Sequence, residues 1–136
     1  MNSTHANYTK SISDIVRHHI AHNRLNTTHD SVMETLNNAI KNGFKIIRFN
    51  NVLFAVKQTQ NSILLSIING DSPKDYVRAL RKFVTFFKSK GIHRFGIYVQ
   101  DQDSATHIGM AAGLHDLKFT HSGIDMEDPY LMVGEV

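Results

Sequence analysis

Residues 68–91 read INGDSPKDYVRALRKFVTFFKSKG, and this stretch decides the fold. Ser72 is suited to cap a helix, and Pro73 follows at the first helical position, where its missing N–H costs nothing. Apolar side chains then recur every three or four residues on one face; they are Tyr76, Val77, Leu80, Phe83, Val84 and Phe87. Gly91 ends the pattern. The spacing predicts a long amphipathic helix whose aromatic face lies on a sheet.

The residues on either side of this helix have the period of strands. Short β-branched runs at 44–49, 52–56 and 63–68 are separated by Asn50-Asn51 and by residues 58–61, which predicts a three-stranded meander. Residues 95–99 predict a strand after the helix. The third meander strand, the helix and this strand then form one parallel crossover, so the sheet is expected to be mixed.

The two ends of the chain add further elements. A helix with Ile12, Ile15 and Val16 is expected to start near Ser11 or Ser13, and a second, capped by Asp30 or Ser31, is expected to end at Gly43. Towards the C-terminus the pattern predicts a helix at 104–117 and strands at 119–124 and 130–133. The prediction is a single α/β (α+β) domain at 12–136, in the order α-α-β-β-β-α-β-α-β-β, after a polar leader at 1–11.

Composition narrows the possible functions. The 136 residues include no Cys and no Trp, which excludes disulfides, thiolate zinc sites and cysteine nucleophiles. No apolar run approaches the roughly 18 residues of a membrane span, so we expect a cytoplasmic protein that does not enter a membrane. Residues 1–100 carry a net charge of +9 and residues 101–136 a net charge of −6. Folding is expected to bring these opposite charges together.

The predicted order of elements, with residues 103–119 reading DSATHIGMAAGLHDLKF, resembles the GNAT N-acetyltransferase superfamily. In that family a turn before the long helix holds the pyrophosphate of acetyl-CoA, and the matching turn here contains Asn69, Gly70, Ser72 and Lys74. The family's general acid is often a Tyr that corresponds here to Leu114. The resemblance therefore implies neighbouring His115, or Tyr98 or Tyr130, as the proton donor.

The turn departs from the family pattern. The family's turn has a Gly followed two positions later by a Gly or Ala, and here the second of these is missing after Gly70. Asp71 and Asp75 stand where a pyrophosphate would lie, and Pro73 offers no N–H. A carboxylate and a phosphate a few ångströms apart repel each other by a few kcal/mol. The chain is also similar to short internal virion or head-assembly proteins of tailed phages, on its length, its basic helix YVRALRKFVTFFKSK and the SATHI opening of the next helix.

The leading hypothesis is therefore a degenerate, non-catalytic GNAT-like protein that binds a protein partner in phage assembly or host interaction, with no cofactor. The first alternative is an acetyl-CoA-dependent N-acetyltransferase. The second is a nucleic-acid-binding module that uses a basic stripe on the long helix, formed by Arg78, Arg81, Lys82 and Lys88. That stripe is also read as a solvated face or as a dock for the acidic residues Asp125, Glu127, Asp128 and Glu135. The sequence does not determine the oligomeric state.

Two further patterns are given structural interpretations. His18 and His22 lie one helical turn apart but lack further ligands, so no metal site is expected. Gly109 and Gly113 flank Met110-Ala111-Ala112 within the predicted 104–117 helix. Close packing on the sheet is the favoured explanation, and close passage of a pantetheine-like chain or of a partner helix is the alternative.

Overall fold

A computed structural model describes residues 10–122 and 128–136. Its elements follow one another in the predicted order. They are α2 (Ile12–His22), α3 (His29–Lys41), β1 (Lys45–Phe49), β2 (Val52–Gln58), β3 (Ser62–Asn69), α4 (Pro73–Lys88), β4 (Arg94–Val99), α5 (Gln102–Ala111), β5 (His115–His121) and β6 (Tyr130–Glu135). Among the described residues no helix is long and apolar enough to cross a membrane.

The six strands form one mixed sheet in the order β1-β2-β3-β4-β6-β5. β3 and β4 pair in parallel, while the other neighbouring pairs are antiparallel. In the β1–β2 hairpin Asn50 has a φ of 53°, which confirms the expected Asn-Asn turn. The prediction of a single α/β domain with a mixed sheet is confirmed.

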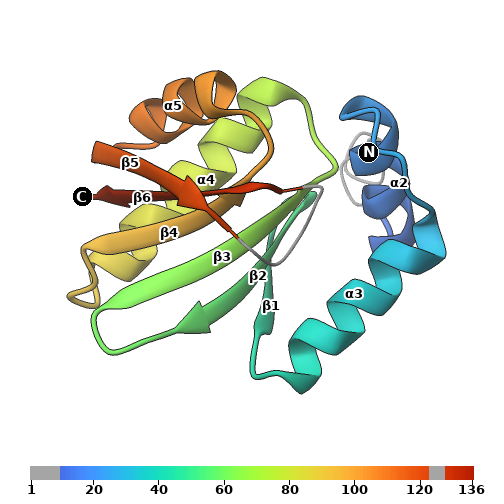
Figure 1. The fold of residues 1–136 in the computed structure, drawn as a ribbon, viewed down its shortest axis with the longest axis horizontal. Helices are drawn as coiled ribbons and strands as arrows, with labels where there is room; N and C mark the ends of the chain where they lie inside the picture. The colour runs from blue at the N-terminus through green and yellow to red at the C-terminus, as the bar shows by residue number, and fades with distance from the viewer. Residues whose placement is uncertain (1–9, 123–127) are drawn as a thin grey trace, which may run out of the picture.

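Helices cover the sheet unevenly. Helices α4 and α5 lie on one face, whereas α2 and α3 lie on the other, at the β1–β3 side (Figure 1). The main core lies between β2, β3, β4, β6 and the α4–α5 layer; a smaller one joins Ile15 and Val16 of α2 to Leu36 of α3, Leu53 and Ile68. The part of the second face formed by β4, β6 and β5 has no helix over it within the described part of the chain.

Helix α4 forms as predicted. The Ser72 side chain accepts a hydrogen bond from the Asp75 N–H, and Pro73 takes the first helical position. Phe83 is fully buried, with its ring stacked on Phe54 at a centroid distance of 4.5 Å, and Val84 and Phe87 are buried beside it. The aromatic face therefore lies in the main core.

The start of α3 differs from the prediction. Thr28 caps the helix by accepting from the Ser31 N–H, so neither Asp30 nor Ser31 is the cap. The spacing of Val32, Leu36, Ala39 and Ile40 predicts one apolar face on this helix, but Ile40 is 51% exposed. The helix begins earlier than predicted because Thr28 has the extended backbone that a cap requires.

The last helix is shorter than predicted. Helix α5 ends at Ala111, and Gly113, which the sequence placed inside it, has a φ of 99° and leads the chain out of the helix. Leu114 is buried behind this turn, and β5 starts at His115. The prediction of a helix to 117 was wrong because Gly113 takes a backbone conformation that helices do not use. The expected strand end at 123–124 lies outside the described residues.

The predicted leader at 1–11 is described only at its last two residues. Ser11 caps α2, as expected, by accepting from the Asp14 N–H. The Lys10 N–H donates to Asn51 Oδ1 at 2.8 Å, and the Lys10 ammonium donates to the Gly70 carbonyl at 2.6 Å. The chain entering α2 is therefore fixed to the two turns at this end of the sheet.

Candidate functional site

The parallel strands β3 and β4 separate at their carboxyl ends. Their pairing runs from Ser62 opposite Arg94 to Leu65 opposite Ile97 and stops there. Beyond this point β3 continues beside β2, and β4 continues beside β6. The divergence opens a gap in the middle of the sheet, at the edge where ligands of parallel strands commonly bind.

Two cavities meet at this gap. One, of about 380 Å³, lies on the side of α4 and α5, and the other, of about 430 Å³, lies under α3. Four residues line both: His19, Ile67, Tyr98 and Asp128. The gap between the strands therefore gives access to both faces of the sheet, and these four side chains stand where the two cavities join.

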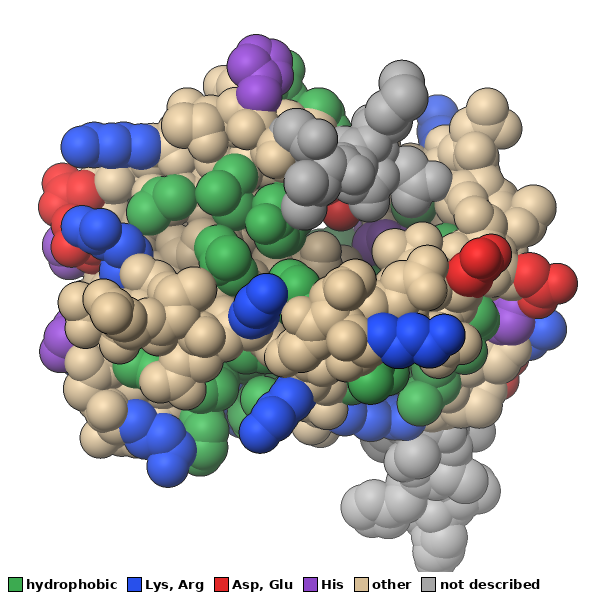
Figure 2. Space-filling model, turned by 60° about the horizontal axis from the view of Figure 1, so that its bottom comes forward, with side chains coloured by type: hydrophobic (Ala, Val, Ile, Leu, Met, Phe, Trp, Pro, Cys, Tyr) green, Lys and Arg blue, Asp and Glu red, His purple; other side chains and the backbone are tan. Residues whose placement is uncertain are grey.

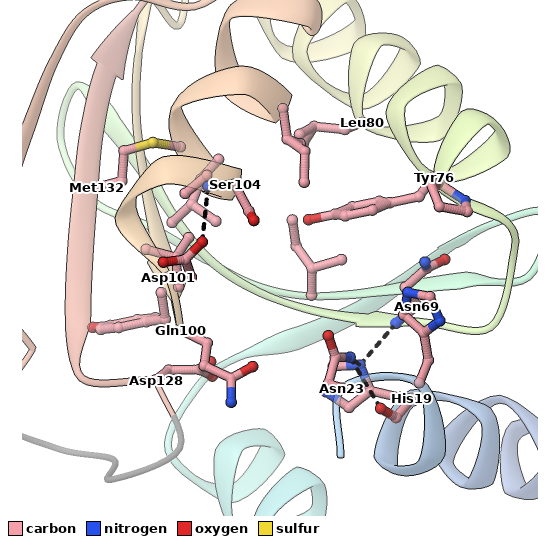
Figure 3. Close-up of a pocket in the computed structure, with 18 of the residues that line it drawn as sticks. His19, Asn23, Asn69, Tyr76, Leu80, Gln100, Asp101, Ser104, Asp128 and Met132 are labelled. Atoms are coloured by element: carbon pink, nitrogen blue, oxygen red, sulfur yellow. Dashed lines mark hydrogen bonds between the residues drawn. The ribbon is translucent and has the colours of Figure 1, made fainter. Parts of the chain in front are cut away.

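His19 of α2 is a neutral imidazole at the rim of the gap (Figure 3). Its Nδ1 accepts from the Asn69 backbone N–H at 3.3 Å, and the Asn23 amide nitrogen lies 3.2 Å from the same atom. Burial, with smaller contributions from the neighbouring His18 and His22, lowers the pKa of His19 to about 4. Because Nδ1 is the acceptor, the ring carries its proton on Nε2.

Tyr76 of α4 points its phenol into the cavity from the same side as His19 (Figure 3). Removal from bulk water raises the pKa of Tyr76, and the carboxylate of Asp128 raises it further. The hydroxyl is therefore protonated at every physiological pH and is available as a donor.

Asp101, at the start of α5, supplies a fixed negative charge to the same cavity. Its side chain caps α5 by accepting from the Ser104 N–H at 3.0 Å. This hydrogen bond lowers the pKa of the Asp101 carboxyl, so the group stays ionised. Together with Asp128 it gives the cavity an acidic wall opposite His19 and Tyr76.

The turn between β3 and α4 is the part that acetyl-CoA binding would require. Four of its N–H groups already have acceptors: Gly70 donates to the Asn51 carbonyl, Asp71 to Asn69 Oδ1, Asp75 to Ser72 Oγ and Tyr76 to the Ser72 carbonyl. Pro73 has no N–H. The donors that a pyrophosphate needs are therefore largely used inside the chain.

Packing also restricts this turn. A Cβ on Gly70 would lie 2.8 Å from the Asn51 carbonyl oxygen and 3.1 Å from the Ile15 Cα, so the glycine lets α2 approach the turn. The Asp71 carboxylate accepts from the Asn51 backbone and side chain, and the Asp75 carboxylate accepts from the Ser72 hydroxyl. With two carboxylates and few unused donors, the residues present do not fit a pyrophosphate.

The structure brings together only some of the residues that the sequence proposed as catalytic. Tyr98 lines both cavities. Tyr130, the first residue of β6, has its ring 5.8 Å from that of His121, and it is not among the described residues lining either cavity. His115 is exposed at the start of β5, with Nδ1 2.9 Å from an Asp116 carboxylate oxygen, away from the gap.

The proposed cofactor-binding residues have structural partners. Asn69 lines the cavity, and its side chain donates to the Asp71 carbonyl and accepts from the Asp71 N–H, while Ser72 is the cap of α4. Lys74 is exposed. Any role in binding CoA remains a prediction for these residues and for Gly70.

The basic stripe lies on the exposed side of α4, and part of it is engaged. Arg78 forms an ion pair with Asp75 at 3.6 Å, and Arg81 donates to the Ala111 carbonyl of α5. Lys82 and Lys88 are exposed. The proposed dock for the acidic residues is not seen where these are described: Glu135 pairs with Arg94 of β4 at 3.8 Å, and Asp128 lines the gap. Asp125 and Glu127 lie outside the described residues.

Histidines cluster on α2 without forming a metal centre. His18 and His22 stack with ring centroids 5.7 Å apart. Over residues 10–122 and 128–136, no group of three or more candidate ligands could hold a metal ion. The same helix contributes His19, which the sequence did not assign to a site.

The sequence also missed Tyr76 and Asp101 as cavity residues. Tyr76 was read as part of the apolar face of the long helix, although its hydroxyl is the only polar group on that face. Asp101 follows a strand that ends at Val99, and side chains just beyond parallel strands often point into a site. Those two signals could have identified both residues.

Comparisons with known proteins agree with this architecture. No protein-family model and no curated protein matches the chain. Among solved structures, a chimera of the spermidine N-acetyltransferase SpeG from Vibrio cholerae and hSSAT is similar, with a TM-score of 0.51 and 14% sequence identity over 94% of this chain and 93% of that one. The chain therefore has a GNAT-like fold. The resemblance to phage assembly proteins has no support in these comparisons.

Proposed function

We propose that the chain is a GNAT-like domain that acts by binding a protein partner and does not transfer acetyl groups from acetyl-CoA. The observation that carries this proposal is the β3–α4 turn, where the N–H groups of Gly70, Asp71 and Asp75 are bonded within the chain. A role in phage assembly or host interaction is a narrower form of the proposal, supported by the sequence resemblance alone.

The second candidate is an acetyl-CoA-dependent N-acetyltransferase, and the gap between β3 and β4 favours it. Two cavities that meet at Tyr98 and Asp128 would let two molecules approach from opposite faces of the sheet. The similar solved structure is named as a spermidine N-acetyltransferase, which makes spermidine the first acceptor to test. An acyl donor would then have to bind without the usual cradle for its phosphates.

Calorimetric titration with acetyl-CoA separates the two candidates. No heat of binding is expected at physiological salt, and no thiol should be released when acetyl-CoA and spermidine are added together. A dissociation constant in the low micromolar range would contradict the proposal. Thiol release that is lost in Tyr98→Phe and retained in His93→Gln, a change at an exposed position outside both cavities, would establish the acetyltransferase instead.

A further inference from the structure

The second face of the sheet has an apolar surface where no helix covers it. α2 packs mainly on β3 and α3 on β1, which leaves β4, β6 and β5 open on this side. Figure 2 shows hydrophobic side chains gathered on one face of the molecule with Lys and Arg at their margin. The strand register identifies the residues that form this surface.

One row of cross-strand neighbours crosses five strands. Lys57 of β2 pairs with Leu64, Leu64 with Gly96, Gly96 with Val133, and Val133 with Lys118 of β5. Neighbouring positions in a row point to the same face of a sheet. The row therefore has an apolar centre and a lysine at each end.

A second row extends the apolar centre towards the gap. Tyr98 pairs with Leu131, two residues further along β4 and β6. A Cβ on Gly96 would lie 2.8 Å from Leu64 Cδ2 and 3.4 Å from Leu131 Cδ1, so the two leucines lean together over the glycine. Leu64, Leu131 and Val133 are all partly exposed. We call these three residues with Tyr98 the open-face patch.

The margins of the open-face patch are basic. The four steps from β2 to β5 place Lys57 and Lys118 about 19 Å apart at the usual strand spacing. Among the described residues, neither lysine forms an ion pair with a carboxylate. Arg94, two residues before Gly96 on β4, is paired with Glu135. The Lys57 ammonium lies over the Phe44 ring at 5.6 Å, which holds it at the edge of the patch.

We propose that the open-face patch binds an amphipathic helix of a protein partner, with an apolar stripe that covers the leucines and acidic residues on both flanks that meet Lys57 and Lys118. A helix with its side chains is about 10–12 Å wide, so it fits between two lysines about 19 Å apart and brings its flanking carboxylates within reach of them. This inference rests on the proposed partner-binding function and names the surface and the partner's chemistry.

Other occupants fit the charges less well. A nucleic acid would place phosphates over Leu64, Leu131 and Val133, which offer them no donor. A second copy stacked on the same face with aligned rows would bring lysine ends towards lysine ends, because a two-fold interface joins identical patches. An acidic-flanked helix satisfies both the apolar centre and the basic margins.

The test uses the full chain and a fluorescent helical peptide with leucines along one face and glutamates on both flanks. Fluorescence anisotropy should show binding that weakens as salt is raised. The double variant Lys57→Glu/Lys118→Glu should weaken binding at least about tenfold, because it turns two attractions into repulsions. The matched control Lys82→Glu/Lys90→Glu makes the same change in net charge at exposed positions in and just after α4, on the other side of the sheet, and should leave binding unchanged.

Several outcomes would overturn the inference. No binding of the peptide, or equal weakening in both double variants, would show that the patch does not select an acidic-flanked helix. Leu64→Asp should also abolish peptide binding, with circular dichroism confirming that the variant is folded. A dimer in sedimentation that Leu64→Asp dissociates would assign the face to a second copy, and tighter binding of an oligonucleotide would assign it to nucleic acid. Calorimetric titration with acetyl-CoA tests the proposed function separately. A failure of the helix-binding proposal can therefore be told apart from a failure of the proposed function.

Discussion

The carboxylate of Asp71 holds Asn51 across 20 residues of sequence. Asp71 Oδ2 accepts from the Asn51 backbone N–H at 3.3 Å, and Oδ1 accepts from the Asn51 side-chain amide at 3.1 Å. Asn51 is 2% exposed. These two hydrogen bonds tie the β1–β2 turn to the β3–α4 turn. They use the negative charge of Asp71, which also makes the β3–α4 turn unsuitable for a pyrophosphate.

Asp71→Ala is expected to lower the free energy of unfolding by roughly 1–3 kcal/mol, because it leaves buried donors of Asn51 without an acceptor. Asp75→Ala, at a half-exposed position on the same turn, should cost less, about 0.5–1 kcal/mol for a weakened helix start. Urea unfolding of both variants checks the order. Equal losses would contradict the structural role given to Asp71.

Phe83→Ala and Phe87→Ala are expected to cost roughly 3–5 kcal/mol each, because both side chains are buried in the main core. Lys82→Ala, on the exposed side of the same helix, should lie within about 0.5 kcal/mol of the parent chain. The measurement is again urea unfolding. If Lys82→Ala proved the most damaging, the face of α4 would be misassigned.

Stability should fall as the pH drops from about 6.5 to about 4, in part through His19. The pKa of His19 is about 4 in the folded chain against an ordinary 6.5, so the unfolded chain takes up the proton first. The contribution is fully present above pH 6.5 and is lost by pH 4, at most about 3 kcal/mol at 1.36 kcal/mol per pKa unit. His18, whose pKa is lowered chiefly by burial, acts in the same direction.

The check is the free energy of unfolding of the parent chain and of His19→Gln at several pH values between 7 and 4. The variant should lose less stability over this range. His93→Gln, at an exposed position, serves as the control and should follow the parent chain. Identical slopes for the parent chain and His19→Gln would show that His19 is not held neutral by the fold.

Gly70→Ala should be strongly destabilising, whereas Gly109→Ala should be tolerated. The new Cβ at residue 70 would meet backbone atoms of Asn51 and Ile15, which cannot move aside cheaply. At residue 109 the nearest atom is the terminal methyl of Met132, at 3.0 Å on a flexible side chain. Alanine also gains about 1 kcal/mol of helix propensity over glycine there. Melting temperatures of the two variants test this contrast.

The basic stripe on α4 is expected not to bind nucleic acid at physiological salt, because Arg78 and Arg81 already have partners within the chain. Binding of a DNA or RNA oligonucleotide should be measured at several salt concentrations. Affinity that falls with a log–log slope of about −0.9 per neutralised phosphate, and that Arg78→Glu/Arg81→Glu abolishes, would favour the nucleic-acid alternative.

The sequence by itself determined the elements whose signals are local. Ser72, Pro73 and the spacing of the phenylalanines specify α4, and the Asn50-Asn51 pair separates two β-branched runs into a hairpin. A cap, a turn residue or a repeat of 3.6 or 2 residues acts over a few positions, so these features are read without knowledge of the rest of the chain. The same local logic failed near Gly113, because a glycine can either continue a helix or end it.

Only the tertiary structure decided the site. Tyr98 and Asn69 were proposed from the sequence and do line the cavity. His19, however, contacts Asn69 from 50 residues away, which no local pattern indicates. His115 lies at the start of β5, away from the gap between β3 and β4. The divergence of β3 from β4 and the leucines that meet over Gly96 likewise depend on which strands become neighbours. Strand order is set by the burial of side chains distant in sequence, and no periodicity of a single segment encodes it.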